Sequence, residues 1–128
     1  MGVEHRRELF LPLDQRSPRR AREFVSAAAD SWGRPELSRE AGLCASELVT
    51  NVLVHTRCAR CQVAVSCTAG HLYVEVHDDS PEAPSKTRTA ADADHGWGLQ
   101  IVDALAATWG VYWAPGEGKS VWLRLDPE

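Results

Sequence analysis

The sequence predicts a two-layer α/β (α+β) sandwich, with helices on one face of a mixed, mostly antiparallel sheet. Two long segments in the first half have apolar residues at helical spacing, and two segments in the second half, 61–68 and 71–79, alternate apolar with polar residues. The expected order is strand, two helices, two strands, loop, helix, two strands. No repeat or linker divides the 128 residues, so we expect one domain, with its core from about residue 9 to 125.

The first half should hold one strand and two helices. Residues 8–13 form a short apolar segment typical of a strand. Ser17 followed by Pro18 predicts a helix N-cap with proline at the first helical position, and this helix should stop at Gly33. A second, longer helix is expected over residues 35–56.

The second half should hold two hairpins separated by a loop and a short helix. Residues 80–95 are rich in Pro, Ala, Asp, Ser and Thr and show no periodicity, which predicts a long loop. The other elements are expected, in chain order, at 61–68 (strand), 71–79 (strand), 98–107 (helix), 108–114 (strand) and 119–125 (strand).

Composition excludes several classes of protein. The chain is 44% hydrophobic and 25% charged, as globular domains are. A net charge of -4 argues against a broad nucleic-acid surface. No run of apolar residues is as long as a membrane span, and the N-terminus has no signal core. We therefore expect a cytoplasmic protein that contacts neither nucleic acid nor membrane.

The four cysteines do not have the pattern of a disulfide framework in a chain with this much apolar sequence. Cys58 and Cys61 have metal or redox spacing, and His55 and His71 lie nearby in the sequence. The favoured interpretation is that all four are free, structural cysteines. A thiol or zinc regulator built on Cys58 and Cys61 is the alternative.

Glu47, Asn51 and His55 form a polar stripe along one face of the longer predicted helix, because each is four residues from the next. The rest of this helix is largely apolar, so polar side chains there need a partner or a cavity. A carboxylate beside a carboxamide oxygen suits a divalent cation, or a base next to a phosphate that carries Mg²⁺.

Asp78 is the second candidate. It falls on the same face of its predicted strand as Leu72, Val74 and Val76, so the alternation places a carboxylate on the apolar side. A buried carboxylate needs hydrogen-bond donors. Two interpretations remain open: Asp78 accepts from the exocyclic amine of an adenine, or it caps the turn that follows it.

The third candidate is the junction between the loop and the next helix, where Gly96 and Gly98 flank Trp97 and Leu99 begins the helix. Glycines let a backbone approach a phosphate, and the first helical turn offers unpaired N–H groups. An ordinary loop-to-helix joint is the alternative, and Trp97 either packs over a nucleotide or fills space. Ser120 at the head of the last strand is either a phosphate contact or part of a hairpin.

Taken together, these residues resemble the GHKL superfamily of Bergerat-fold ATPases, from about residue 9 to 125. The likeness is greatest to its small branch of anti-sigma-factor serine/threonine kinases. One departure is the turn after Asp78, which lacks both glycines of the family's D-x-G-x-G. The similar motifs are Glu47-x-x-x-Asn51 (the N box), Val74 to Asp78 (the adenine strand), Gly96-x-Gly98-Leu99 (a glycine box) and Gly118 to Trp122 (the last strand).

The resemblance implies roles for individual residues. Asn51 would coordinate Mg²⁺ between the phosphates of ATP, Glu47 would be the general base, and Asp78 would read adenine. Residues 80–95 would form the ATP lid. The remaining nucleotide-binding residues that it implies are Gly96, Trp97, Gly98, Leu99 and Ser120.

The implied function is that of an ATP-dependent protein serine/threonine kinase. Its expected partners are a sigma factor, which it sequesters, and an anti-anti-sigma antagonist, which it phosphorylates; a homodimer is among the expected assemblies. The alternative is a catalytically silent ATP-binding module that acts by partner binding alone. A sensor histidine kinase, a topoisomerase or a chaperone ATPase is disfavoured, because 128 residues leave no room for their additional domains.

Overall fold

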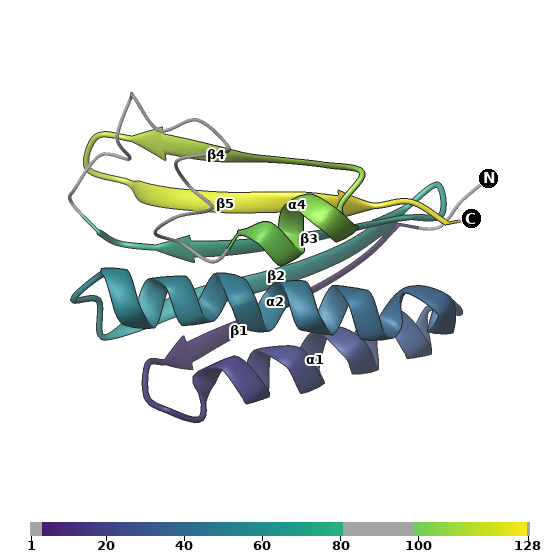
Figure 1. Cartoon of the computed structure of the whole chain (residues 1–128), viewed down its shortest axis with the longest axis horizontal. Coiled ribbons are helices and arrows are strands. Elements are labelled where there is room, and N and C mark those ends of the chain that lie inside the picture. Colours follow the sequence, from purple (N-terminus) through teal and green to yellow (C-terminus); the bar gives the residue numbers. More distant parts are fainter. Residues whose placement is uncertain (1–3, 81–98, 128) are drawn as a thin grey trace.

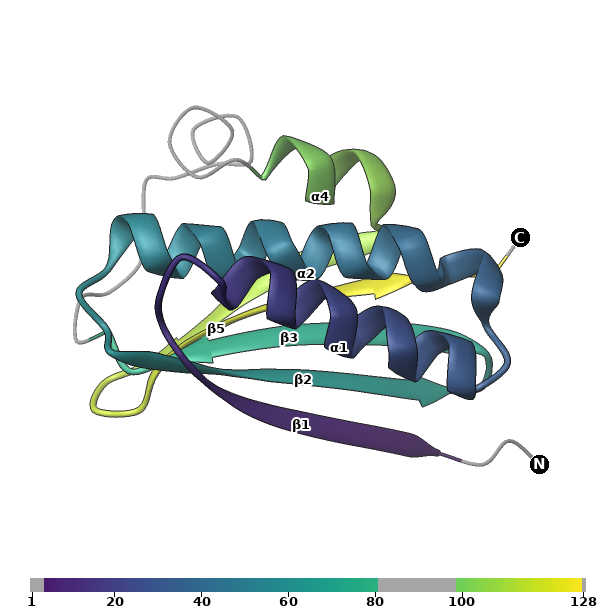
Figure 2. The ribbon, with the colours of Figure 1, turned by 90° about the horizontal axis from the view of Figure 1, so that it is seen from below.

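A computed structural model of the chain describes residues 4–80 and 99–127. Over these residues five strands form one sheet in the order β1-β2-β3-β5-β4. Figure 2 shows the three described helices on one face of this sheet. The elements are β1 (His5–Pro12), α1 (Ser17–Ser31), α2 (Pro35–His55), β2 (Arg60–Thr68), β3 (His71–Asp78), α4 (Gln100–Leu105), β4 (Thr108–Ala114) and β5 (Gly118–Leu125).

The predicted fold class is confirmed, with helices in one layer and the sheet in the other. All four described strand pairings are antiparallel, where the sequence predicts a mixed, mostly antiparallel sheet. Within the described ranges, no helix combines the length and the apolar character needed to cross a membrane. Of the predicted loop 80–95, only Ser80 falls among the described residues.

The order of the strands brings distant parts of the sequence together. β3 pairs with β5 rather than with β4, so the end of β3 lies beside the start of β5 (Figure 1). Asp78, the last residue of β3, is the register partner of Lys119 on β5 and of Cys61 on β2. This register creates the site described below.

The core lies between the sheet and the helices, with α2 over the centre of the sheet and α1 over β1 and β2. The inner faces of the strands follow the predicted alternation, since Leu72, Val74 and Val76 are all buried. The helices α1 and α2 are joined by a reciprocal pair of bonds: Ser26 Oγ donates to the Ser38 carbonyl at 2.9 Å, and Ser38 Oγ to the Ser26 carbonyl at 3.1 Å.

Two predictions of local structure were wrong. Ser17 is not the N-cap of α1, because the cap position falls on Arg16. The Ser17 hydroxyl instead donates to the Pro12 carbonyl and accepts from the Asp14 N–H, both at 2.8 Å. Its role is therefore to close the turn between β1 and α1.

β1 also begins earlier than expected, at His5 instead of Glu8. The extra residues are polar, so their alternation carried no apolar signal. These residues pair with β2, and two of them pack on Trp32. The His5 ring stacks on the Trp32 ring with centroids 5.3 Å apart, and the Arg7 guanidinium carbon lies 5.4 Å from the centroid of the Trp32 ring.

Candidate functional site

Two residues of the polar stripe of α2, Asn51 and His55, lie where this helix meets β3 and β5. A cavity of about 10 Å³ lies between these elements, with room for about one water molecule. Asn51 lines it, and its buried Nδ2 atom has no hydrogen-bond partner among the described residues. The residues that line the cavity are Leu48, Asn51, Val52, His55, Val76, Lys119 and Val121.

Asp78 lies at the same end of the sheet, with only 2% of its surface exposed. Its Oδ1 atom accepts a 2.8 Å hydrogen bond from the Ser80 backbone N–H, so the predicted turn-capping role is observed. Its Oδ2 atom has no hydrogen-bond partner among the described residues. One oxygen of the carboxylate therefore holds the turn, and the other remains available to a ligand.

Lys119 is a residue of this site that the sequence interpretation missed. Its Nζ atom lies 3.5 Å from Asp78 Oδ2, and both side chains are at least nine-tenths buried. Lys119 shares the inner face of β5 with Val121 and Leu123. The same alternation that placed Asp78 on the inner face could have placed Lys119 there as well.

Ser120, by contrast, lies on the outer face of the sheet, because strand neighbours point to opposite sides. Its hydroxyl forms a 2.8 Å hydrogen bond with His77 Nδ1, and His77 is on the outer face of β3. The Ser120 side chain therefore lies on the face of the sheet opposite Asn51 and Asp78. The residue of β5 that lies beside those two side chains is Lys119.

Of the other predicted site residues, the structure describes Glu47 and Leu99. Glu47 is half-buried on α2, one helical turn before Asn51, as the spacing indicated. Leu99 is a buried residue of the core at the N-cap position of α4, and its carbonyl accepts the Asp103 N–H at 2.8 Å. Gly96, Trp97 and Gly98 lie outside the described residues.

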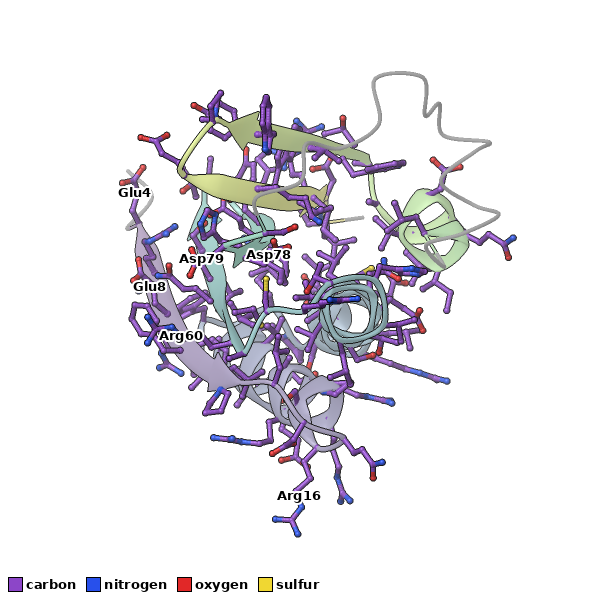
Figure 3. The ribbon with its side chains drawn as sticks, turned by 90° about the vertical axis from the view of Figure 1, so that its left-hand side faces the viewer. Glu4, Glu8, Arg16, Arg60, Asp78 and Asp79 are labelled. Carbon is purple, nitrogen blue, oxygen red and sulfur yellow. The ribbon has the colours of Figure 1, made fainter. Side chains whose placement is uncertain are left out.

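A larger cavity of about 430 Å³ lies at this end of the molecule, and the two residues that follow Asp78 line part of it. Its volume is in the range of small-molecule sites. Figure 3 views the molecule from this end, with Asp78, Asp79 and Arg60 labelled. The described residues that line the cavity are His55, Thr56, Arg57, Cys58, Ala59, Arg60, Asp79 and Ser80.

The cysteines are all free thiols, as predicted. Burial, followed by the nearby carboxylates of Glu40 and Glu47, raises the pKa of Cys44 to about 12. Burial, followed by Asp78 and Cys58, raises the pKa of Cys61 to about 11. Over residues 4–80 and 99–127, no group of three or more His, Cys, Asp or Glu side chains is arranged to hold a metal.

Cys58 should therefore be the thiol that reacts first with a disulfide reagent at pH 8 in the folded protein. It is half-buried, whereas Cys44, Cys61 and Cys67 are buried. A thiol with a pKa of about 11 is ionised in only about one molecule in a thousand at that pH, so Cys61 reacts slowly. Stopped-flow titration should give one fast thiol, which the Cys58→Ser variant lacks. Two fast thiols in wild type would contradict this assignment.

Comparisons with known proteins support the fold and show the family. A search of curated proteins found no match. Among solved structures, a blue-light activated histidine kinase from Erythrobacter litoralis EL346 is similar, with 28% sequence identity and a TM-score of 0.56. The match covers 71% of this chain and 30% of that one, so this chain spans under a third of the kinase's length. Residues 11–125 match the family model described as the histidine kinase-like ATPase domain. The chain therefore belongs to the family of histidine kinase-like ATPase domains.

Proposed function

We propose that this protein binds ATP with Mg²⁺ and transfers the γ-phosphoryl group to a serine or threonine of a partner protein. The observation that carries the proposal is a pair of buried polar atoms, Asn51 Nδ2 and Asp78 Oδ2, that have no hydrogen-bond partner among the described residues. Leaving such atoms without a hydrogen bond costs free energy, and Oδ2 has only the ionic contact with Lys119 Nζ at 3.5 Å. Both belong to residues at the junction of α2, β3 and β5, and a ligand there would satisfy them.

The two atoms fit the two ends of a magnesium nucleotide. Asp78 Oδ2 is a hydrogen-bond acceptor, as the exocyclic amine of adenine requires. A half-turn of the Asn51 side-chain amide exchanges its nitrogen for its oxygen, and a carboxamide oxygen is a suitable ligand for Mg²⁺. When bound, Mg²⁺ would neutralise the charge that develops on the transferred phosphoryl group.

Glu47 is the proposed general base. It precedes Asn51 by one turn on the same face of α2, so a residue that holds the metal and a carboxylate lie side by side. In this role Glu47 orients the attacking hydroxyl of the partner and accepts its proton. The rest of the chemistry is positioning and charge neutralisation, as in other phosphoryl transfers.

The partners proposed are those of the anti-sigma-factor branch that the motifs resemble. In that scheme the protein sequesters a sigma factor until an unphosphorylated anti-anti-sigma antagonist displaces it. Phosphorylation of the antagonist by the kinase restores sequestration. The second candidate is an ATP-binding module that acts by partner binding alone, without transfer.

Glu47→Gln should separate these two functions. We expect transfer to a purified antagonist to fall at least about a hundredfold, since a general base contributes 10²–10⁴, while ATP affinity stays within about threefold. Transfer is measured with radiolabelled ATP followed by acid treatment, because phosphoserine and phosphothreonine survive acid and phosphohistidine does not. Glu40→Gln, earlier on the same helix, is the matched control.

Three results would count against the proposal. Wild type that binds ATP but labels no antagonist supports the silent module. An acid-labile label points to histidine as the acceptor. Undiminished transfer by Glu47→Gln removes Glu47 from the mechanism while leaving the kinase activity in place.

A further inference from the structure

The ion pair between Lys119 and Asp78 is an unusual feature for the inner face of a sheet. A lysine side chain in this layer must leave water, which is costly unless the ammonium group finds a partner. The register makes Lys119 the direct neighbour of Asp78, and Nζ lies 3.5 Å from Oδ2. The side chains are 9% and 1% exposed, so the pair is closed off from bulk solvent.

A base that hydrogen-bonds to Asp78 Oδ2 would lie close to this ammonium group, because Nζ is 3.5 Å from that oxygen. The Oδ1 atom is already bonded to the Ser80 N–H, so Oδ2 is the oxygen left for a ligand, and it is the oxygen next to Nζ. Lys119 also lines the small cavity beside Asn51 and Val76. An acceptor and a donor are therefore presented together at one point of the site.

Adenine has the complementary edge, because its exocyclic amine is a donor and the adjacent ring nitrogen, N1, is an acceptor. We propose that Lys119 is a second base-reading residue, whose ammonium donates to N1 while Asp78 Oδ2 accepts from the amine. This inference rests on the proposed function. An ammonium has three N–H donors, so the contact with Asp78 alone does not exhaust its capacity to donate to a base.

The test uses an ATP analogue in which N1 is replaced by C–H (1-deaza-ATP). Wild type should bind it about tenfold to a hundredfold more weakly than ATP, the usual effect of losing a hydrogen bond to a charged group. Lys119→Met keeps the length of the side chain but has no donor. For this variant the two affinities should agree within about threefold, because no bond to N1 remains to be lost.

The ratio of the ATP affinity to the 1-deaza-ATP affinity is compared between wild type and Lys119→Met. This comparison separates the hydrogen bond to N1 from other effects of the analogue. Removing N1 also alters the amine, but it does so equally for both proteins, so only the difference between the two ratios reports on Lys119. Calorimetry measures the affinities, and circular dichroism checks that each variant is folded. Lys119→Arg retains a donor, so it should still bind 1-deaza-ATP more weakly than ATP, at least in part. If Lys119→Met does not fold, Lys119→Arg is the variant that is compared with wild type.

The possible outcomes are distinct. Equal penalties in wild type and Lys119→Met would overturn the inference, as would the absence of any penalty in wild type or in a folded Lys119→Arg. In each of these cases ATP still binds, and the proposed function stands. Failure of wild type to bind ATP at all would overturn the proposed function and this inference with it.

Discussion

Replacing Asp78 by asparagine should weaken ATP binding by about one to two orders of magnitude. The asparagine side chain keeps the shape of aspartate and can still accept the Ser80 N–H through its oxygen. The atom that replaces Oδ2 is then an NH₂ group, which faces the amine of adenine donor to donor. The same NH₂ group also faces the Lys119 ammonium, whose positive charge the Asp78 carboxylate balances in wild type.

Calorimetric titration with ATP, with and without Mg²⁺, measures this effect. Wild type should bind, and Mg²⁺ should strengthen its binding. Asp30→Asn is the control, because Asp30 is exposed on α1 and lines neither cavity. It removes the same charge at a distance from the site, and its affinity should stay within about threefold of wild type.

The same variant has a second consequence that must be measured separately. Asp78→Asn leaves a buried ammonium without its counter-ion, which commonly costs about 3–5 kcal/mol of folding stability. Urea denaturation establishes conditions under which the variant is folded before binding is compared. If folded Asp78→Asn binds ATP as wild type does, Asp78 does not read the base and the nucleotide lies elsewhere.

Much of the site could be predicted because it lies on regular elements. The spacing of Glu47, Asn51 and His55 is a helical repeat, and α2 presents Asn51 and His55 to the cavity. The alternation along β3 placed Asp78 on the inner face, and it is buried there. In both cases local periodicity alone determined which way the side chain points.

What could not be predicted depends on pairing between distant strands. The Asp78–Lys119 ion pair follows from the register of β3 against β5, and no local pattern states that register. The position of Ser120 depends on the same register, since its hydroxyl bonds to His77, its partner on β3, on the outer face of the sheet. Ser17 shows the same limit, because its hydroxyl bonds to Pro12, on the preceding strand.

Gly118→Ala should destabilise the fold by roughly 3 kcal/mol or more. Gly118 begins β5 with a φ of 78°, a conformation that residues with a Cβ rarely adopt. A Cβ atom there would also collide with the carbonyl oxygen of Asp78 and lie 3.0 Å from the Asp79 Cα. The obstacle is backbone, which cannot rotate aside as a flexible side chain can, so β3 and β5 would have to separate.

Gly116→Ala is a control from the same turn. Gly116 has the same φ of 78°, but a Cβ atom there would meet nothing within 4 Å. It should cost only the backbone strain, about 1 kcal/mol. Urea denaturation of both variants therefore isolates the steric contribution of the close approach to Asp78. Equal losses of stability would show that β5 does not approach the Asp78 backbone this closely.

The two glycine variants should also differ in function. Separating β3 from β5 moves Asp78 relative to Lys119 and Asn51, so Gly118→Ala should lose ATP affinity even under conditions where it is folded. Gly116→Ala leaves that register intact and should bind as wild type does. A folded Gly118→Ala protein with unchanged ATP affinity would mean that the nucleotide does not depend on this junction of strands. The placement of the base beside Asp78 would then be wrong, however well ATP binds.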